Sequence, residues 1–190
     1  MKANRTVWTT AALVTATLGA VAMPTAATAA TPRAATAAAC PTGWGSLDKV
    51  DWSYTAGEYI TNARTGRHEC YDRFVVDVPA ASADQIGYTV HYVDRLIQDP
   101  TGDPIPITGG AILEVIVRAP AYDSGAPTYP GQAGQPLPGL NLTGYRTFRD
   151  AKFASSFEGQ SQFGLGLRAR LPFRVLQLDG RLVVDVAHTW

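Results

Sequence analysis

The chain carries no surplus of charge of either sign. It contains 16 Lys and Arg against 16 Asp and Glu, and charged residues make up only 17% of its 190 residues. Proteins that bind nucleic acid present a strongly basic face, and attachment to anionic lipid needs a cluster of Lys and Arg. Since the sequence has no basic run, it predicts neither nucleic-acid binding nor a polybasic membrane contact.

The sequence also lacks the motifs of the common hydrolases. It has no G-x-S-x-G elbow and no H-E-x-x-H pair. The acidic residues of "DPTGDP", Asp99 and Asp103, could cup a calcium ion, but hydrogen bonding within a turn explains them more simply. We therefore expect no enzymatic activity, no cofactor and no metal site. The three histidines are His68, His91 and His188.

The most apolar stretch lies at the start of the chain. Lys2 and Arg5 precede the uncharged run "VWTTAALVTATLGAVAM", and "TAATAA" follows with small residues at Ala27 and Ala29. This order is typical of a secretory signal peptide, whereas a membrane anchor needs about 20 strongly apolar residues. We expect a signal peptide at residues 1–30, and no other stretch that could span a bilayer.

The rest of the sequence divides into a leader and one domain. Residues 31–39, "TPRAATAAA", are of low complexity and predict a flexible leader. Residues 40–190 have the length of a single domain. Removal of Lys2 and Arg5 with the signal peptide leaves 16 − 2 = 14 basic side chains against 16 acidic ones, a net charge of −2.

Only two cysteines are present, Cys40 and Cys70, and both follow the signal peptide. In an exported protein such a pair most simply forms a disulfide, which would stabilise the fold by roughly 3–4 kcal/mol. The alternative is a lipid-modified Cys40, because "AAAC" loosely resembles a lipoprotein cleavage site. Since Cys40 lies far beyond the apolar run, we expect the disulfide.

Helical periodicity is also missing, whereas alternating apolar residues recur at short intervals. "GYTVHYVDRL" and "AILEVIVRA" alternate as strands do, and "RTGRH" predicts a hairpin turn around Gly66. The glycines of "FGLGL" suggest a bulge or a close backbone approach. Residues 119–139 are rich in Pro and Gly and predict a long surface loop, and "SADQI" could form a short helix. The pattern indicates an all-β domain, a sandwich of two sheets.

One phrase is written twice, as "RFVVDV" and as "RLVVDV". On a strand, Arg73 and Asp77 share one face with Val75, and Arg181 and Asp185 share one face in the second copy. Cross-strand Arg–Asp contacts could form on those faces. We interpret the two aspartates as strand-face carboxylates rather than catalytic ones, and the copies as equivalent core strands of two facing sheets.

Several motifs together resemble the AMIN-like domain of exported proteins and lipoproteins of actinobacteria. They are "GWGS", "RTGRHECYDRFVVDV", "GYTVHYV", "VRAPAYD", "FEGQSQFGLGLRARLPFRV" and "RLVVDVAH", in this order over residues 40–190. AMIN domains proper are β-sandwich modules that help to hold cell-wall amidases and secretins at the envelope, in part by binding peptidoglycan. The resemblance implies an AMIN-like sandwich and, by analogy, association with peptidoglycan; it brings no catalytic residue.

A group of polar residues flanks the repeated phrases. If the two phrases lie close in space, their neighbouring histidines and carboxylates could approach one another and hydrogen-bond a glycan or peptide, or bind a metal. The simpler interpretation is that they stabilise turns and strand ends. The candidate ligand-binding residues are Arg64, His68, Asp72, Glu158 and His188.

Aromatic residues offer a second route to a glycan. Trp44 and Trp52, with Tyr122 and Tyr129 of the loop, could supply stacking faces, although core packing is the simpler expectation for Trp52 and, less strongly, for Trp44. We expect a secreted, non-enzymatic module that associates with a cell-wall glycan. The rival hypothesis is a secreted module that docks or inhibits an envelope enzyme through loop 119–139.

Overall fold

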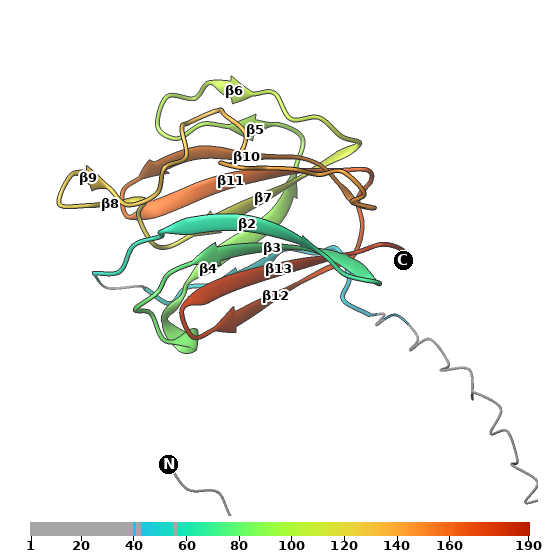
Figure 1. The fold of residues 1–190 in the computed structure, drawn as a ribbon, viewed down its shortest axis with the longest axis horizontal. Coiled ribbons are helices and arrows are strands. Elements are labelled where there is room, and N and C mark those ends of the chain that lie inside the picture. Colours follow the sequence, from blue (N-terminus) through green and yellow to red (C-terminus); the bar gives the residue numbers. More distant parts are fainter. Residues whose placement is uncertain (1–39, 41–42, 55–56) are drawn as a thin grey trace, which may run out of the picture. The chain divides into compact units, whose positions relative to one another are not determined.

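The computed structural model describes residue 40, residues 43–54 and residues 57–190. This part of the chain is built almost wholly from antiparallel strands in two packed sheets, so the predicted all-β sandwich is confirmed (Figure 1). The segment "SADQI" forms a single turn of 3-10 helix at Ala83–Gln85. No helix in these ranges is long and apolar enough to cross a membrane. The predicted signal peptide and leader, residues 1–39, lie outside the described ranges.

The first sheet has five strands and the second has four. In spatial order the first contains β1 (Lys49–Asp51), β4 (Tyr88–Val93), β7 (Ala111–Val117), β11 (Gln160–Leu167) and β10 (Phe148–Phe157). The second contains β12 (Phe173–Leu178), β13 (Arg181–Ala187), β3 (Tyr71–Asp77) and β2 (Asn62–Arg67). Two small hairpins, β5 (Leu96–Ile97) with β6 (Pro104–Ile105) and β8 (Tyr122–Asp123) with β9 (Ala126–Pro127), complete the set.

Period-two alternation places the core between the sheets. Phe74 and Val76 of β3 are fully buried and face the interior, as Leu113 and Val115 of β7 do from the other sheet. The rings of Phe74 and Phe163 meet edge to face, with centroids 5.3 Å apart. Phe74 and Val76 thus lie on the face opposite Arg73 and Asp77, as the alternation in the sequence predicts.

The repeated phrases lie side by side, not in facing sheets as expected. Strands β3 and β13 are antiparallel neighbours in the four-stranded sheet, with Val75 opposite Val183 and Arg73 opposite Asp185. Because Arg and Asp stand four positions apart in both copies, antiparallel pairing also sets Arg181 opposite Asp77. Two copies of the phrase are therefore complementary when they pair antiparallel, so the same short sequence can form two neighbouring strands.

The glycines of "FGLGL" mark a close approach on the outer face of the five-stranded sheet. A Cβ atom on Gly164 would lie 2.3 Å from a methyl carbon of Leu96, and one on Gly166 would lie 2.0 Å from the carbonyl oxygen of Thr108. The segment from β5 to β7 therefore lies directly on β11, with Leu96 and Ile105 in a small second core. The bulge that the glycines also suggested is not in β11; the two register irregularities fall in its partner β10, between Phe148 and Asp150 and between Phe153 and Ser155.

The predicted turn is displaced by a few residues. Gly66 lies inside β2, opposite Arg73, and the chain reverses at residues 68–71, where the amide of His68 donates to the carbonyl of Tyr71 at 3.0 Å. Cys70 occupies this turn and forms the predicted disulfide with Cys40, with an S–S distance of 2.03 Å. The bridge thus ties the segment before β1 to the β2–β3 hairpin.

The Pro- and Gly-rich loop is fastened to the sandwich rather than free on its surface. Tyr129 and Leu137 are each only 3% exposed and belong to the main core. The amides of Gly134 and Leu137 donate to carbonyls of β10 at 2.8 and 3.1 Å. The second half of loop 119–139 therefore covers the free edge of β10, and only the β8–β9 hairpin projects from it (Figure 1).

Replacement of Tyr129 by Phe tests whether the hydroxyl of this anchoring residue is buried without a partner. The buried Tyr129 hydroxyl has no hydrogen-bond partner among the described residues, so Tyr129→Phe should keep the free energy of unfolding or raise it by up to about 1 kcal/mol. Burial raises the pKa of Tyr129 to about 12, from 10.0. As the pH rises, the tyrosine therefore ionises first in the unfolded chain. Between pH 10 and about pH 12 the free energy of unfolding of the wild type should fall more steeply than that of the variant.

The matched control for this experiment is Tyr92→Phe. The Tyr92 hydroxyl donates to the carbonyl of Leu171 at 2.6 Å and accepts from the amide of Leu171 at 2.9 Å. Its removal should cost about 1 kcal/mol or more in urea denaturation. A cost for Tyr129→Phe as large as that for Tyr92→Phe would contradict the burial of the Tyr129 hydroxyl without a hydrogen-bond partner.

Candidate functional site

The five candidate residues do not form one cluster. Asp72 and His188 meet inside the molecule, whereas Glu158 lies in the turn between β10 and β11. Asp72 binds the first residue of β10, and Glu158 follows the last, so the ten-residue strand separates them by roughly 30 Å. The expected approach of Glu158 to the histidines is therefore wrong.

The pair of Asp72 and His188 is buried, at 1% and 5% exposure. His188 Nε2 lies 3.1 Å from Asp72 Oδ1, and His188 Nδ1 lies 3.1 Å from the carbonyl oxygen of Glu69. The other carboxylate oxygen, Asp72 Oδ2, accepts from the amides of Thr147 and Phe148 at 2.6 and 3.2 Å. One side-chain pair thus joins the start of β3, the end of β13 and the start of β10.

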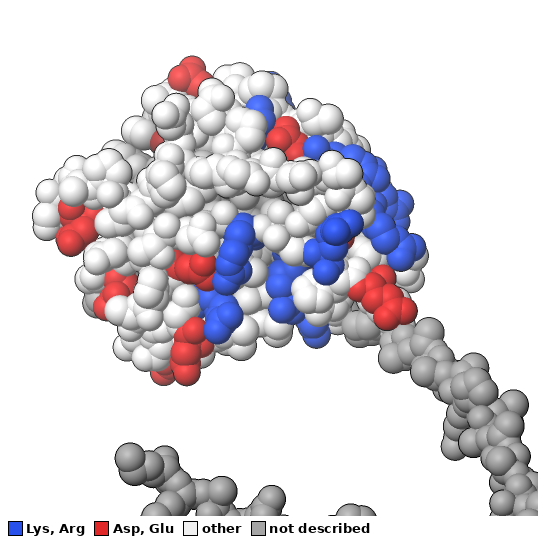
Figure 2. Space-filling model, viewed as in Figure 1, with Lys and Arg blue, Asp and Glu red and all other residues white. Residues whose placement is uncertain are grey.

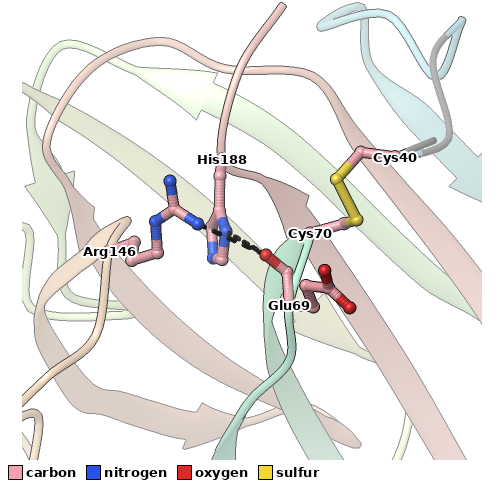
Figure 3. The surroundings of a disulfide bond; sticks show 5 residues. All are labelled: Cys40, Glu69, Cys70, Arg146 and His188. Atoms are coloured by element: carbon pink, nitrogen blue, oxygen red, sulfur yellow. Dashed lines mark hydrogen bonds between the residues drawn. A yellow bond between two sulfur atoms is a disulfide. The ribbon is translucent and has the colours of Figure 1, made fainter. Parts of the chain in front are cut away.

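The carbonyl of Glu69 links this pair to the surface. Arg146 Nη1 donates to the same oxygen that His188 faces, at 3.4 Å, and the Cys40–Cys70 disulfide lies next to it in the chain (Figure 3). In the part of the chain that the structure describes, no hydroxyl or thiol hydrogen-bonds to the His188 ring. The pair therefore forms a polar lock between strands.

A second buried carboxylate organises the outer face of the four-stranded sheet. Asp185 is fully buried and accepts from Arg73 through both oxygens, at 2.6 and 2.9 Å, and from Arg174 at 2.9 Å. The expected cross-strand Arg–Asp contact is confirmed here, and the hydrogen bond to Asp185 raises the pKa of Arg73. This ion triad fixes β3, β13 and β12 to one another.

Asp77, the aspartate of the first phrase, is paired differently. Asp77 accepts from the guanidinium of Arg64 at 2.9 Å and from the side-chain amide of Asn62 at 3.1 Å, and both donors are on β2. Arg181, its partner in register, forms no ion pair within the described ranges. The candidate Arg64 therefore belongs to this side of the sheet, bound to a strand-face carboxylate.

Aromatic rings gather beside the ion triad, at the disulfide end of the sheet. The ring of His68 stacks on Tyr71 with centroids 4.4 Å apart, and Trp44 tilts against Tyr71 at 5.7 Å. The guanidinium of Arg174 lies 4.4 Å above the Trp44 ring. His68 is exposed, while Trp44 and Tyr71 are half-buried. We call Trp44, His68 and Tyr71, with Arg73 and Arg174, the aromatic platform.

The remaining aromatic predictions are divided. Trp52 is 77% exposed and carries the guanidinium of Arg118 at 4.3 Å, so the expectation that it packs in the core is wrong. Tyr129 is buried, and Tyr122 lines a shallow pocket of about 230 Å³ together with Tyr54 and Tyr59.

Sequence reasoning missed one polar row on the five-stranded sheet. Glu114 binds His91 Nε2 at 3.1 Å and Gln162 Nε2 at 2.6 Å, and Gln162 accepts from Ser155 at 3.0 Å. The only signal was Glu114 itself, an acidic residue inside the apolar strand β7. No group of His, Cys, Asp and Glu side chains suited to a metal ion is found in the described part of the chain.

Comparison with known proteins supplies the family. Residues 58–188 match the family model of the AMIN-like domain, which covers the two phrases, Tyr71 and His188. The chain belongs to the AMIN-like family. Membership relates it to modules of the cell envelope and its peptidoglycan. The matched AMIN-like region begins after Cys40 and Trp44, so the segment that completes the platform precedes it. Neither the curated proteins nor the solved structures gave a match.

The Asp72–His188 lock gives a stability prediction for the AMIN-like domain. Asp72→Ala strands two buried amides and the His188 ring without acceptors, so it should lower the free energy of unfolding by about 3–5 kcal/mol. Asp72→Asn should cost less, because an amide oxygen can still accept from both backbone groups. The control Asp77→Ala breaks a partly exposed pair and should cost about 1 kcal/mol or less. Equal costs for the two alanine variants in urea denaturation would contradict the role of the lock.

Proposed function

We propose that the protein is an exported, non-enzymatic module that associates with peptidoglycan or another cell-wall glycan through the aromatic platform. The observation that carries this proposal is the platform itself, where rings of Trp44, His68 and Tyr71 lie beside two guanidinium groups. Its position on an AMIN-like domain gives the ligand class, because the family is related to the envelope and its peptidoglycan.

The platform offers the two kinds of contact that a glycan needs. The apolar faces of sugar rings pack on aromatic side chains, which combine a flat apolar body with a polar edge. Arg73 and Arg174 add hydrogen-bond donors that suit hydroxyl and carboxylate oxygens.

Rigid support should favour binding on this face. Tyr71 and Arg73 are on β3 and Arg174 is on β12, and the buried Asp185 of β13 holds both guanidiniums. The disulfide ties Cys40, four residues before Trp44, to Cys70, the neighbour of Tyr71. Groups that are ordered before the ligand arrives lose less entropy on binding.

Two observations support the other parts of the proposal. A disulfide is typical of proteins that work in an oxidising compartment outside the cytoplasm. Two of the three histidines contact carboxylates of the fold: His188 faces Asp72 and a carbonyl, and His91 Nε2 faces Glu114. A protein-docking role for loop 119–139 has less support, since the buried Tyr129 and Leu137 leave mainly the β8–β9 hairpin for a partner.

Two tryptophans that each carry an arginine allow a direct test. Trp44→Ala removes a ring of the platform, and Trp52→Ala removes a ring that also carries an arginine at about the same distance, elsewhere on the molecule. In sedimentation assays with purified peptidoglycan, Trp44→Ala should weaken binding about tenfold, as the loss of about 1.4 kcal/mol of stacking would, and Trp52→Ala should bind like the wild type.

Folding of both variants is checked by thermal unfolding with the disulfide intact. Wild-type protein that is not enriched on peptidoglycan over an unrelated secreted protein would contradict the proposed function. Binding that depends on Trp52 and not on Trp44 would move the site away from the platform.

A further inference from the structure

Five exposed arginines gather at the disulfide end of the sandwich. They come from three separate parts of the sequence: the end of β2, the start of β10 and the segment after β11. Figure 2 shows Lys and Arg side chains from the middle of the face to this edge, at the right of the view, with one acidic group at the lower end of the edge and most other visible acidic groups toward the left. We call this group the arginine end; it contains Arg67, Arg146, Arg149, Arg168 and Arg170.

No carboxylate of the described residues forms an ion pair with these arginines, although the exposed Glu69 lies in the turn that Arg146 contacts. Within the described ranges none of the five lies within 4.0 Å of an Asp or Glu oxygen, in contrast to Arg64, Arg73 and Arg174 on the adjoining sheet face. The overall balance of charge in the sequence therefore conceals a local excess of positive charge. Such an excess attracts anionic partners over several ångströms.

Backbone carbonyls hold the guanidiniums in place instead. Arg146 donates to the carbonyl of Glu69 at 3.4 Å, Arg149 to that of Phe148 at 2.9 Å, and Arg168 to that of His188. A carbonyl orients a guanidinium without cancelling its charge and leaves other N–H groups free to donate. The arginine end is thus ordered before a ligand arrives, which lowers the entropy lost on binding.

The arginine end continues directly from the aromatic platform. Arg146 binds the carbonyl of Glu69, the neighbour of His68. On the other side, Arg170 binds the carbonyl of Ser46 at 3.1 Å, two residues after Trp44. A polymer that lies on the platform therefore brings its charged substituents against the arginines.

We propose that the arginine end binds the carboxylates of the peptide stems that peptidoglycan carries on its glycan strands. This inference rests on the proposed function and names the second half of the same surface. A guanidinium fork matches the two oxygens of a carboxylate, and the stems are attached to the strand that the platform would hold. Phosphate groups of other wall polymers share the anionic chemistry, so the experiment must separate the two sources.

The test uses the disulfide-bonded protein without its signal peptide and three polymers. The first is peptidoglycan freed of phosphate polymers, the second is the same material with its carboxylates converted to amides, and the third is peptidoglycan that still carries its phosphate polymers. Arg146→Gln/Arg149→Gln removes two charges from the arginine end. The control Arg181→Gln/Lys152→Gln removes two charges from β13 and β10, outside it.

The wild type should bind the first polymer about tenfold more tightly than the amidated one. Added salt should weaken binding to the first polymer and leave binding to the amidated polymer unchanged. Arg146→Gln/Arg149→Gln should bind both polymers equally, while the control should behave like the wild type. Arg146→Lys/Arg149→Lys keeps the charge without the fork and should give an intermediate affinity. Arg67→Gln supplies an independent variant if the double glutamine variant unfolds.

Three outcomes would overturn the inference. Equal wild-type binding to amidated and unmodified peptidoglycan would show that the carboxylates are not the ligand of the arginine end. The proposed function would not be affected. Binding only to the polymer that retains phosphate would assign the arginine end to phosphate instead. Absence of wild-type binding to all three polymers would overturn the proposed function as well.

Discussion

The structure depends on one fully buried carboxylate, Asp185, held between the guanidiniums of Arg73 and Arg174. Three of the four strands of the second sheet meet at this ion triad, and the aromatic platform lies against the same two arginines. Loss of the carboxylate would leave two part-buried cations without a partner, which is costly in a protein interior. The interaction that joins the strands therefore also sets the geometry of the surface to which we assign function.

Strand chemistry explains why the chain writes one phrase twice. Arg and Asp four positions apart share a face, and antiparallel pairing of two such phrases sets each Arg opposite an Asp. The sequence therefore predicts the faces of Phe74 and Val76 and the type of contact between Arg73 and Asp185. It cannot predict that the two strands are neighbours in one sheet, because pairing between segments a hundred residues apart is settled by the packing of the whole sandwich.

The site follows the same division. Asp72 and His188 flank the two phrases, so their meeting follows once β3 and β13 are paired, whereas Glu158 is separated from them by the length of β10. Trp52 was misassigned because an aromatic residue in an irregular segment carries no period from which burial can be read. The sequence does not reveal the arginine end, because its five members come from three separate segments and form no run. The sequence reveals charged clusters that are contiguous along the chain, whereas a cluster that forms on folding is seen only in the structure.

The platform and the arginine end together form one continuous surface at the disulfide end of an AMIN-like domain, and association of this surface with the cell wall is the central claim. The most direct measurement is a titration of the isotope-labelled protein with soluble peptidoglycan fragments, followed by residue-resolved NMR. Association through this surface predicts concentration-dependent shifts at the Trp44 indole N–H and at the amides of Tyr71 and Arg146, with Trp52 and Tyr122 unchanged. Shifts confined to Trp52 and Tyr122, or none at saturating fragment concentrations, would contradict it.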